Sequence, residues 1–159
     1  MSVQDEIKEL KQRISELEEQ VEEEQEFPKY KDFYWGVNAK GKVFCDTWEG
    51  FKFEKDMLSI GNVYQTENEA VLAVEKLKVE AELRKFSRPF EYGKFNYCLL
   101  FDIDGNNFRT DVTSYCPSQG AIYFESEEKA QEAVSTVGEE RIKKYIFSEW
   151  RPNYETSRY

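Results

Sequence analysis

The 159-residue sequence contains no histidine. Imidazole is the side chain that ordinarily changes its charge near neutral pH, so its absence excludes Ser-His-Asp and Cys-His nucleophile pairs and imidazole general bases. It also removes the commonest metal ligand among side chains. Any catalysis would have to use carboxylates, lysine or tyrosine. We therefore expect a non-catalytic protein that requires no cofactor and no metal.

Paired cysteines and long apolar runs are also missing. Cys45, Cys98 and Cys116 are far apart and belong to no CxxC pair, a pattern typical of buried thiols in a reducing cytoplasm. No stretch approaches the roughly 18 apolar residues that a membrane-spanning helix needs. The charged N-terminus lacks the apolar core of a secretory signal. We expect a cytoplasmic protein without a membrane partner.

Acidic residues are in excess, and the excess is concentrated at one end. The net charge is −10, and residues 1–26 hold ten acids against three bases, a balance of −7, which leaves −3 for the other 133 residues. A field of this sign repels nucleic acid, so we expect no direct DNA binding, whereas a basic protein partner is compatible with it. Aromatic residues make up 16% of the chain, which favours a packed globule over a disordered chain.

Residues 1–26 are predicted to form a coiled-coil dimerisation helix. Apolar residues recur at alternating spacings of four and three, with β-branched residues at position a and mostly leucine at d, which favours a parallel two-stranded coiled coil. Across such a dimer Glu6 would face Lys11, and Arg13 would face Glu18. The alternative is an amphipathic helix folded back on its own domain. The predicted dimerisation residues are Val3, Ile7, Leu10, Ile14, Leu17 and Val21.

After Pro28 the apolar period changes from helical to two, which indicates strands. Residues 33–37 and 42–46 are predicted to pair across a turn, and Val63-Tyr64 to form a short third strand. Thr66 with Glu69 fits a capping box that opens a helix. Its predicted buried stripe is Ala70, Val74, Leu77 and Ala81.

The second half of the chain repeats this order. Strands are predicted over 95–102, 108–113 and 122–124, with an Asp104-Gly105 turn between the first two. Ser126 is predicted to cap a helix that Gly138 interrupts or ends. The predicted buried residues of this helix are Ala130, Ala133, Val134 and Val137.

The stretches GNVYQTENEAVLAV and GAIYFESEEKAQEAV therefore occupy the same place in two similar units. We predict an α+β protein: a coiled-coil helix over 1–26, then two β-β-β-α units over 27–94 and 95–147, packed as a pseudo-symmetric α/β sandwich. One such unit could cover only one face of its small sheet, whereas pairing buries both. Residues 148–159 are predicted to be an extended tail.

The stretch Leu99 to Asn106 resembles the hydrophobic strand and DxD signature of haloacid-dehalogenase-type phosphatases. The first unit has Asn-Ala-Lys-Gly at the corresponding place and no DxD, and too few residues follow for the rest of such a domain. We interpret Asp102 and Asp104 as hairpin residues.

Partner-binding candidates come from two groups of residues. The first is the acidic run after the heptads, and the second is the tryptophans, which have charged or small polar neighbours and are expected to be partly exposed. The candidates are Glu22, Glu23, Glu24, Glu26, Trp35, Trp48 and Trp150.

Residues 61–70 (GNVYQTENEA), with Gly120-Ala121-Ile122-Tyr123-Phe124 and Gly138-Glu139-Glu140-Arg141 in the second half, resemble a pattern in uncharacterised small proteins of phages and prophages of Gram-positive bacteria. The resemblance covers roughly residues 33–147. It carries no catalytic residues, and it implies a protein that acts inside a host cell, where small acidic phage proteins often block host machinery, CRISPR nucleases included.

Our leading hypothesis is a dimeric, non-catalytic interaction protein that inhibits a host defence or nucleic-acid-handling protein, with acidic mimicry of DNA as one mechanism. Three alternatives stay open. The first is a sponge or sensor that binds a nucleotide-like ligand between the repeats. The second is an enzyme that uses carboxylates, and the third is a replication or structural accessory protein.

Overall fold

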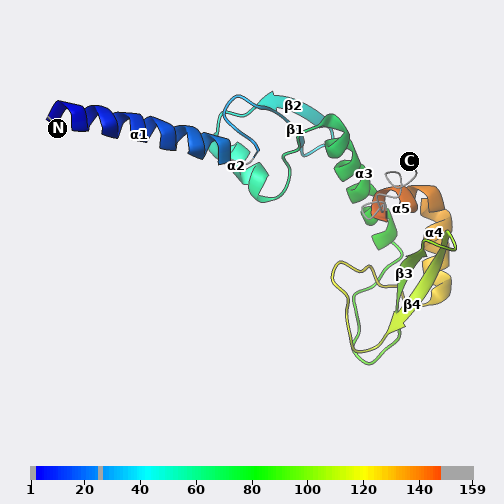
Figure 1. Cartoon of the computed structure of the whole chain (residues 1–159). Helices are drawn as coiled ribbons and strands as arrows, with labels where there is room; N and C mark the ends of the chain where they lie inside the picture. The colour runs from blue at the N-terminus through cyan, green and yellow to red at the C-terminus, as the bar shows by residue number, and fades with distance from the viewer. Residues whose placement is uncertain (1–2, 25–26, 148–159) are drawn as a thin grey trace, which may run out of the picture. The chain divides into compact units, whose positions relative to one another are not determined.

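The structure, a computed structural model, describes residues 3–24 and 27–147, with side chains for 3–17 and 27–147. Contacts divide the chain into two compact units, Met1–Val71 (unit 1) and Leu72–Tyr159 (unit 2). Helices and two small antiparallel sheets make up the described part, so the predicted α+β class is confirmed (Figure 1). In the described range no helix is both long and apolar enough to cross a bilayer.

Unit 1 contains helix α1 (Val3–Glu24) and a hairpin of strands β1 (Phe33–Val37) and β2 (Val43–Thr47). The strands are antiparallel, with Phe33 opposite Thr47 and Val37 opposite Val43. The predicted turn between them is confirmed, because the Asn38 side chain accepts the N–H groups of Lys40 and Lys42 at 2.9 and 3.1 Å.

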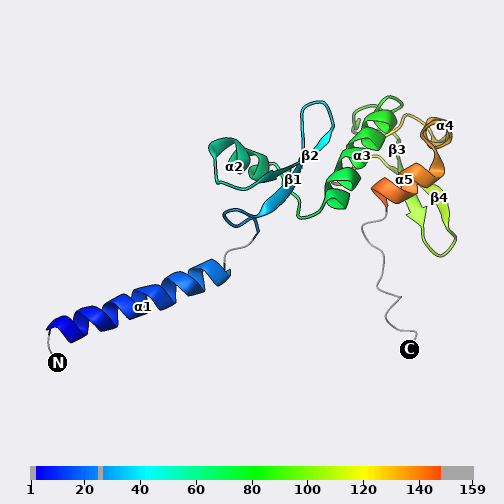
Figure 2. The ribbon, with the colours of Figure 1, turned by 90° about the horizontal axis from the view of Figure 1, so that it is seen from above.

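The segment after the hairpin forms helix α2 (Lys52–Ser59), which lies beside β1 and β2 (Figure 2). Glu54 in its first turn is 1% exposed, and its carboxylate accepts the N–H groups of Phe51 at 2.7 Å and Glu49 at 3.1 Å. These bonds satisfy donors that the start of a helix leaves free. The burial of a carboxylate is therefore explained by helix capping.

Trp48 lies in the core of unit 1, with 7% of its surface exposed, so the expectation that it is partly exposed is wrong. Its ring packs edge-on against Tyr34, which is fully buried, at 5.7 Å between centroids. The expectation rested on the polar neighbours of Trp48. In extended chain, neighbouring side chains point to opposite faces, so Thr47 and Glu49 carry no information about the face of Trp48.

Helix α3 (Glu67–Arg84) begins in unit 1 and ends in unit 2. The predicted capping box is present, since the N–H of Glu69 donates to the Thr66 hydroxyl at 3.3 Å and the Glu69 carboxylate accepts the N–H of Thr66 at 3.2 Å. The predicted buried stripe is only half right. Ala70 and Val74 are buried, whereas Leu77 is 62% exposed and Ala81 is exposed, and Val79 and Leu83 are buried in their place.

Unit 2 holds a longer hairpin, β3 (Asn96–Asp102) with β4 (Asn107–Thr113), and helices α4 (Glu127–Val137) and α5 (Glu139–Ile146). The Ser126 hydroxyl caps α4 by accepting the N–H of Lys129, and Gly138, with φ of 102°, separates α4 from α5. The core joins the end of α3 to α4 and α5. It consists of Val79, Leu83, Phe124, Ala130, Ala133, Val134, Val137 and Ile142, which includes every residue predicted to be buried in α4.

The two predicted third strands are single β-bridges. Trp35 pairs with Tyr64, and Tyr97 pairs with Phe124, so in the described part each sheet has two strands. Each bridge residue is followed by helix after two intervening residues, which limits the ladder on that side of the bridge.

Only one of the three cysteines has the buried environment that their spacing suggested. Cys98 is buried on β3, whereas Cys45 and Cys116 are exposed. Burial in an apolar setting raises the pKa of the Cys98 thiol, with the Asp111 carboxylate adding to the effect. The expectation of buried thiols is thus wrong for Cys45 and Cys116.

Candidate interaction surfaces

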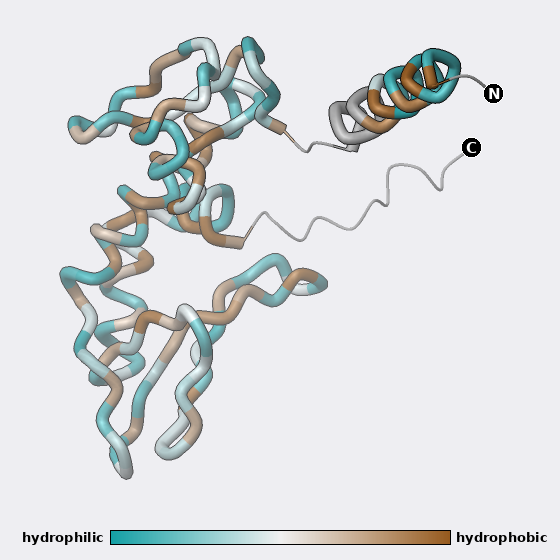
Figure 3. The backbone as a smooth tube through the Cα atoms, turned by 90° about the vertical axis from the view of Figure 1, so that its left-hand side faces the viewer, coloured by the Kyte–Doolittle hydropathy of each residue, from teal (hydrophilic) through white to brown (hydrophobic). Residues whose placement is uncertain are grey.

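The apolar seam of α1 is exposed to solvent. Apolar and polar residues alternate along the helix (Figure 3). Five of the six predicted dimerisation residues have described side chains, and each is about half exposed or more. Their exposed fractions are 72% for Val3, 48% for Ile7, 61% for Leu10, 54% for Ile14 and 53% for Leu17. Such a contiguous apolar stripe typically marks a surface that another molecule covers.

The remaining arm residues are only partly described. Val21, Glu22, Glu23 and Glu24 lie within the α1 backbone, whose bounds are Val3–Glu24, and their side chains are not described. Glu26 and Trp150 lie outside the described residues. Their predicted roles stay predictions.

Trp35 is half-buried on β1, where its backbone exchanges hydrogen bonds with Tyr64 at 2.9 and 2.8 Å. At the end of β1, a side chain forms the backbone hydrogen bonds that a neighbouring strand would otherwise form. The Asn62 amide accepts the N–H of Val37 at 2.9 Å and donates to its carbonyl at 2.7 Å, as a neighbouring strand would. Sequence reasoning missed Asn62, because nothing local links a loop residue to a strand end 25 positions earlier.

A pair of exposed aromatic rings lies at the start of α2. Phe51 and Phe53 are 53% and 54% exposed, and their rings stack at 6.0 Å between centroids. Exposed aromatic pairs are favoured anchors in protein interfaces. Sequence reasoning missed this pair, because the apolar pattern of residues 51–60 assigns them neither to a helix nor to a strand.

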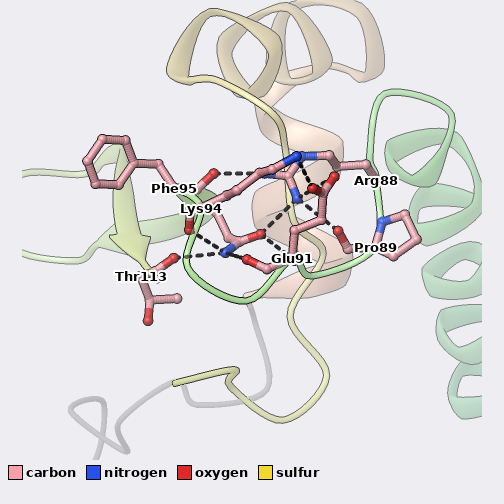
Figure 4. Close-up of polar contacts among 7 residues, drawn as sticks. Arg88, Pro89, Glu91, Lys94, Phe95 and Thr113 are labelled. Carbon is pink, nitrogen blue, oxygen red and sulfur yellow. Dashed lines mark hydrogen bonds and ion pairs between the residues drawn. The ribbon is translucent and has the colours of Figure 1, made fainter. Parts of the chain in front are cut away.

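A polar network fixes the 88–95 loop of unit 2 (Figure 4). The Asn96 side chain is fully buried; it accepts hydrogen bonds from the Arg88 guanidinium and the Glu91 N–H, and donates to the carbonyls of Glu91, Lys94 and Thr113. Arg88 also donates to the Phe95 carbonyl at 2.8 Å. Every polar atom of the Asn96 side chain has a partner, so we interpret the network as structural.

The Asp102 and Asp104 pair lies at the β3–β4 hairpin, as predicted. Asp102 ends β3; its carboxylate accepts the Gly105 N–H at 3.2 Å and forms an ion pair with Arg109 at 2.6 Å. Asp104 belongs to the turn. Within the described residues no group of three or more Cys, Asp or Glu side chains could hold a metal ion. The Asp102 carboxylate therefore stabilises the hairpin by contacting both its turn and strand β4.

A polar cavity of about 380 Å³ lies between β4 and α4. Its walls include the carboxylates of Glu127 and Glu139 and the guanidinium of Arg109. That guanidinium is already paired with Asp102, and Glu127 accepts a hydrogen bond from Thr110 at 3.1 Å. The balance of charge disfavours an anionic ligand such as a nucleotide here.

Comparison of the chain with protein-family models, with curated proteins and with solved structures found no match. The resemblance to phage proteins therefore stays a prediction.

Proposed function

We propose that this chain is a non-catalytic interaction protein that acts as a parallel homodimer joined through α1. The observation that carries the proposal is the exposed seam of α1, whose described residues are 48–72% exposed. An apolar face of this length is unfavourable in water, and the heptad spacing gives it a specific occupant, a second copy of the same helix.

The energetics favour such a dimer. Burial of an exposed aliphatic side chain stabilises by about 1.5–3 kcal/mol at most, and association costs about 4–15 kcal/mol. Five described seam residues from each chain would offset that cost. The predicted Glu6–Lys11 and Arg13–Glu18 pairs would add little energy, but they favour the parallel arrangement.

We further propose that the partner is a host protein with a basic, nucleic-acid-binding groove, and that the chain inhibits it. Two features support this: the −7 balance of residues 1–26, and the resemblance to phage proteins. A parallel dimer places two such segments side by side. Their carboxylates would approximate the charge density of a nucleic-acid backbone, as an anti-CRISPR protein that mimics DNA would require.

We also propose that the two units are copies of one ββα unit. Two observations support it. Both hairpins carry a single bridge, Trp35–Tyr64 and Tyr97–Phe124, and both bridges precede a capped helix at the same distance. The pseudo-symmetric packing of the units stays a prediction.

Light scattering on charge-matched variants tests the dimer. Ile7→Lys with Ile14→Lys places two charges in the seam, and we expect a monomer at about tens of micromolar, where the native chain should be dimeric. Gln12→Lys with Ser15→Lys makes the same change of charge on the opposite side of the helix, and should stay dimeric. A native chain that is monomeric under these conditions would overturn the proposal.

A pull-down from host lysate, read by mass spectrometry, tests the partner. We expect the native chain to retain a nucleic-acid-binding protein, and the seam variant to retain much less of it. Retention of the same protein by both chains would contradict a role for the dimer in binding. Co-purification of a nucleotide without any protein would instead support the ligand-binding alternative.

A further inference from the structure

An apolar cavity of about 270 Å³ lies in unit 2 where α5 ends. Its walls come from β3, the 118–122 loop, the end of α3 and the last residues of the described chain, and they include Leu83, Cys98, Ile122, Ile146 and Phe147. Small-molecule sites usually have volumes of about 300–1,000 Å³. This smaller, mainly apolar cavity suits a single large side chain better than a cofactor or substrate.

The chain itself supplies such a side chain close by. Phe147 is fixed in the core, since its ring lies 6.0 Å from that of Phe101 and 5.8 Å from that of Phe108. The described chain therefore ends at the cavity wall. Trp150 follows Phe147 by three residues, so its Cα lies within about 11 Å of the wall even at full extension.

The charges on the rim also suit residues 148–159. Asp111 lies on the rim and is exposed, and its carboxylate forms no ion pair with the described residues. The residue after Trp150 is Arg151, whose guanidinium carries the opposite charge. If an indole occupies the cavity, the long Arg151 side chain on the next residue is available to pair with the Asp111 carboxylate, and attraction between opposite charges favours that pairing.

We propose that the apolar cavity of unit 2 is the docking site of the chain's own C-terminal segment, residues 148–159, with Trp150 as the anchor and Arg151 beside Asp111. The role of Trp150 would then differ from the partner contact that the sequence suggested: its indole would occupy a cavity of its own chain. The proposal does not depend on the α1 dimer or on the identity of the partner.

Cys98 gives a direct readout, because its side chain lines the cavity and is 8% exposed. In a chain with Cys45→Ser and Cys116→Ser, Cys98 is the remaining thiol, and its rate of reaction with a disulfide reagent measures access to the cavity. We expect Trp150→Ala to raise this rate about tenfold or more, as loss of an aromatic anchor should. Trp150→Phe should retain most of the protection, and the neighbouring change Glu149→Ala should leave the rate unchanged.

An unchanged rate in Trp150→Ala would overturn the proposal. Protection that disappears when the chain is diluted would also overturn it, in favour of a segment donated by a second copy. An independent measurement uses 5-fluorotryptophan, with the Trp150 resonance assigned by its loss in Trp150→Phe. A docked indole gives a ¹⁹F shift that does not respond to exchange of H₂O for D₂O, whereas a solvent-responsive shift would place Trp150 outside the cavity.

Discussion

Asn96 organises a loop through a single buried side chain. Its amide oxygen accepts hydrogen bonds from the Arg88 Nη1 at 2.8 Å and the Glu91 N–H at 2.9 Å, and its amide nitrogen donates to three carbonyls. Asn96→Ala would remove all five of these hydrogen bonds from the buried loop. We expect a loss of about 2–4 kcal/mol in the free energy of unfolding, measured by urea denaturation.

An exposed asparagine provides the control for that experiment. Asn68 is in the first turn of α3 and is exposed, so Asn68→Ala should change stability by less than about 0.5 kcal/mol. If the two substitutions had equal effects, the Asn96 network would contribute no more than an ordinary surface residue.

Gly36 lies against closely packed side chains in unit 1. A Cβ atom at this position would lie 2.7 Å from Met57 Cε and 2.8 Å from Phe44 Cζ. We expect Gly36→Ala to destabilise the protein by about 1–3 kcal/mol through overpacking, measured by thermal unfolding. In a Met57→Ala background the same change should cost less, because one of the two clashing groups is gone. An equal cost in both backgrounds would locate the effect elsewhere.

At the level of elements, α5 is tied to α3 by one bidentate ion pair. The Arg141 guanidinium donates to both carboxylate oxygens of Glu82, at 2.9 and 3.0 Å. These hydrogen bonds hold the pKa of the Glu82 carboxyl below its usual value of 4.5. A carboxyl group whose folded-state pKa is lowered stabilises the fold above its unfolded pKa, and this contribution is lost as the pH falls through the folded value.

We therefore expect Glu82→Gln to lower stability at pH 7 and to have progressively less effect below pH 4.5, the usual value of this group. The size should be modest, because the pair is partly solvated. Urea denaturation across this pH range is the measurement. Glu80→Gln is the matched control, since Glu80 approaches Arg84 only at 3.9 Å. A difference between native chain and Glu82→Gln that is independent of pH would rule out the ion pair as its cause.

For the whole molecule, the distribution of charge predicts how the proposed partner is bound. If residues 1–26 meet a basic groove, the affinity should fall steeply as salt is raised, because ions screen exposed charges over about 10 Å at 0.1 M. Replacing the carboxylates of the acidic run by amides should slow association more than it speeds dissociation, as measured by surface plasmon resonance. The residues to change to Gln are Glu22, Glu23, Glu24 and Glu26.

If neither salt nor these substitutions changed the binding, we would conclude that the interface lies on the α/β body. The exposed Phe51–Phe53 pair is then the first surface to test, with Phe53→Ser.

The sequence predicted local features well, where one short pattern determines the outcome. The Thr66 and Ser126 caps, the turn at Asn38 and the buried face of α4 are all local. It failed where the answer depends on contacts far along the chain. Residues 70–74 are all apolar, so periodicity alone does not select the buried face of α3. In unit 2 that face is set by the packing of Val79 and Leu83 in the core with Phe124 and residues of α4 and α5.

The candidate surfaces show the same division between local and distant information. The seam of α1 follows from heptad spacing alone, and the structure shows its described residues exposed. The apolar cavity of unit 2 is lined by residues from several separate segments between Glu80 and Phe147. No single stretch of sequence therefore predicts it. The hydrogen bonds between Asn62 and Val37 could not be predicted from the sequence either, because they join positions 25 apart.

The placement of the tryptophans allows indole fluorescence to report on the unfolding of a single unit. Trp35 and Trp48 both belong to unit 1, and residues 72–147 contain none. In a Trp150→Phe chain, indole emission would report unit 1 alone, while far-ultraviolet circular dichroism would report the helices of both units. Coincidence of the two denaturation curves would mean that the units, which share α3, melt as one cooperative body, and separate midpoints would give each unit its own stability.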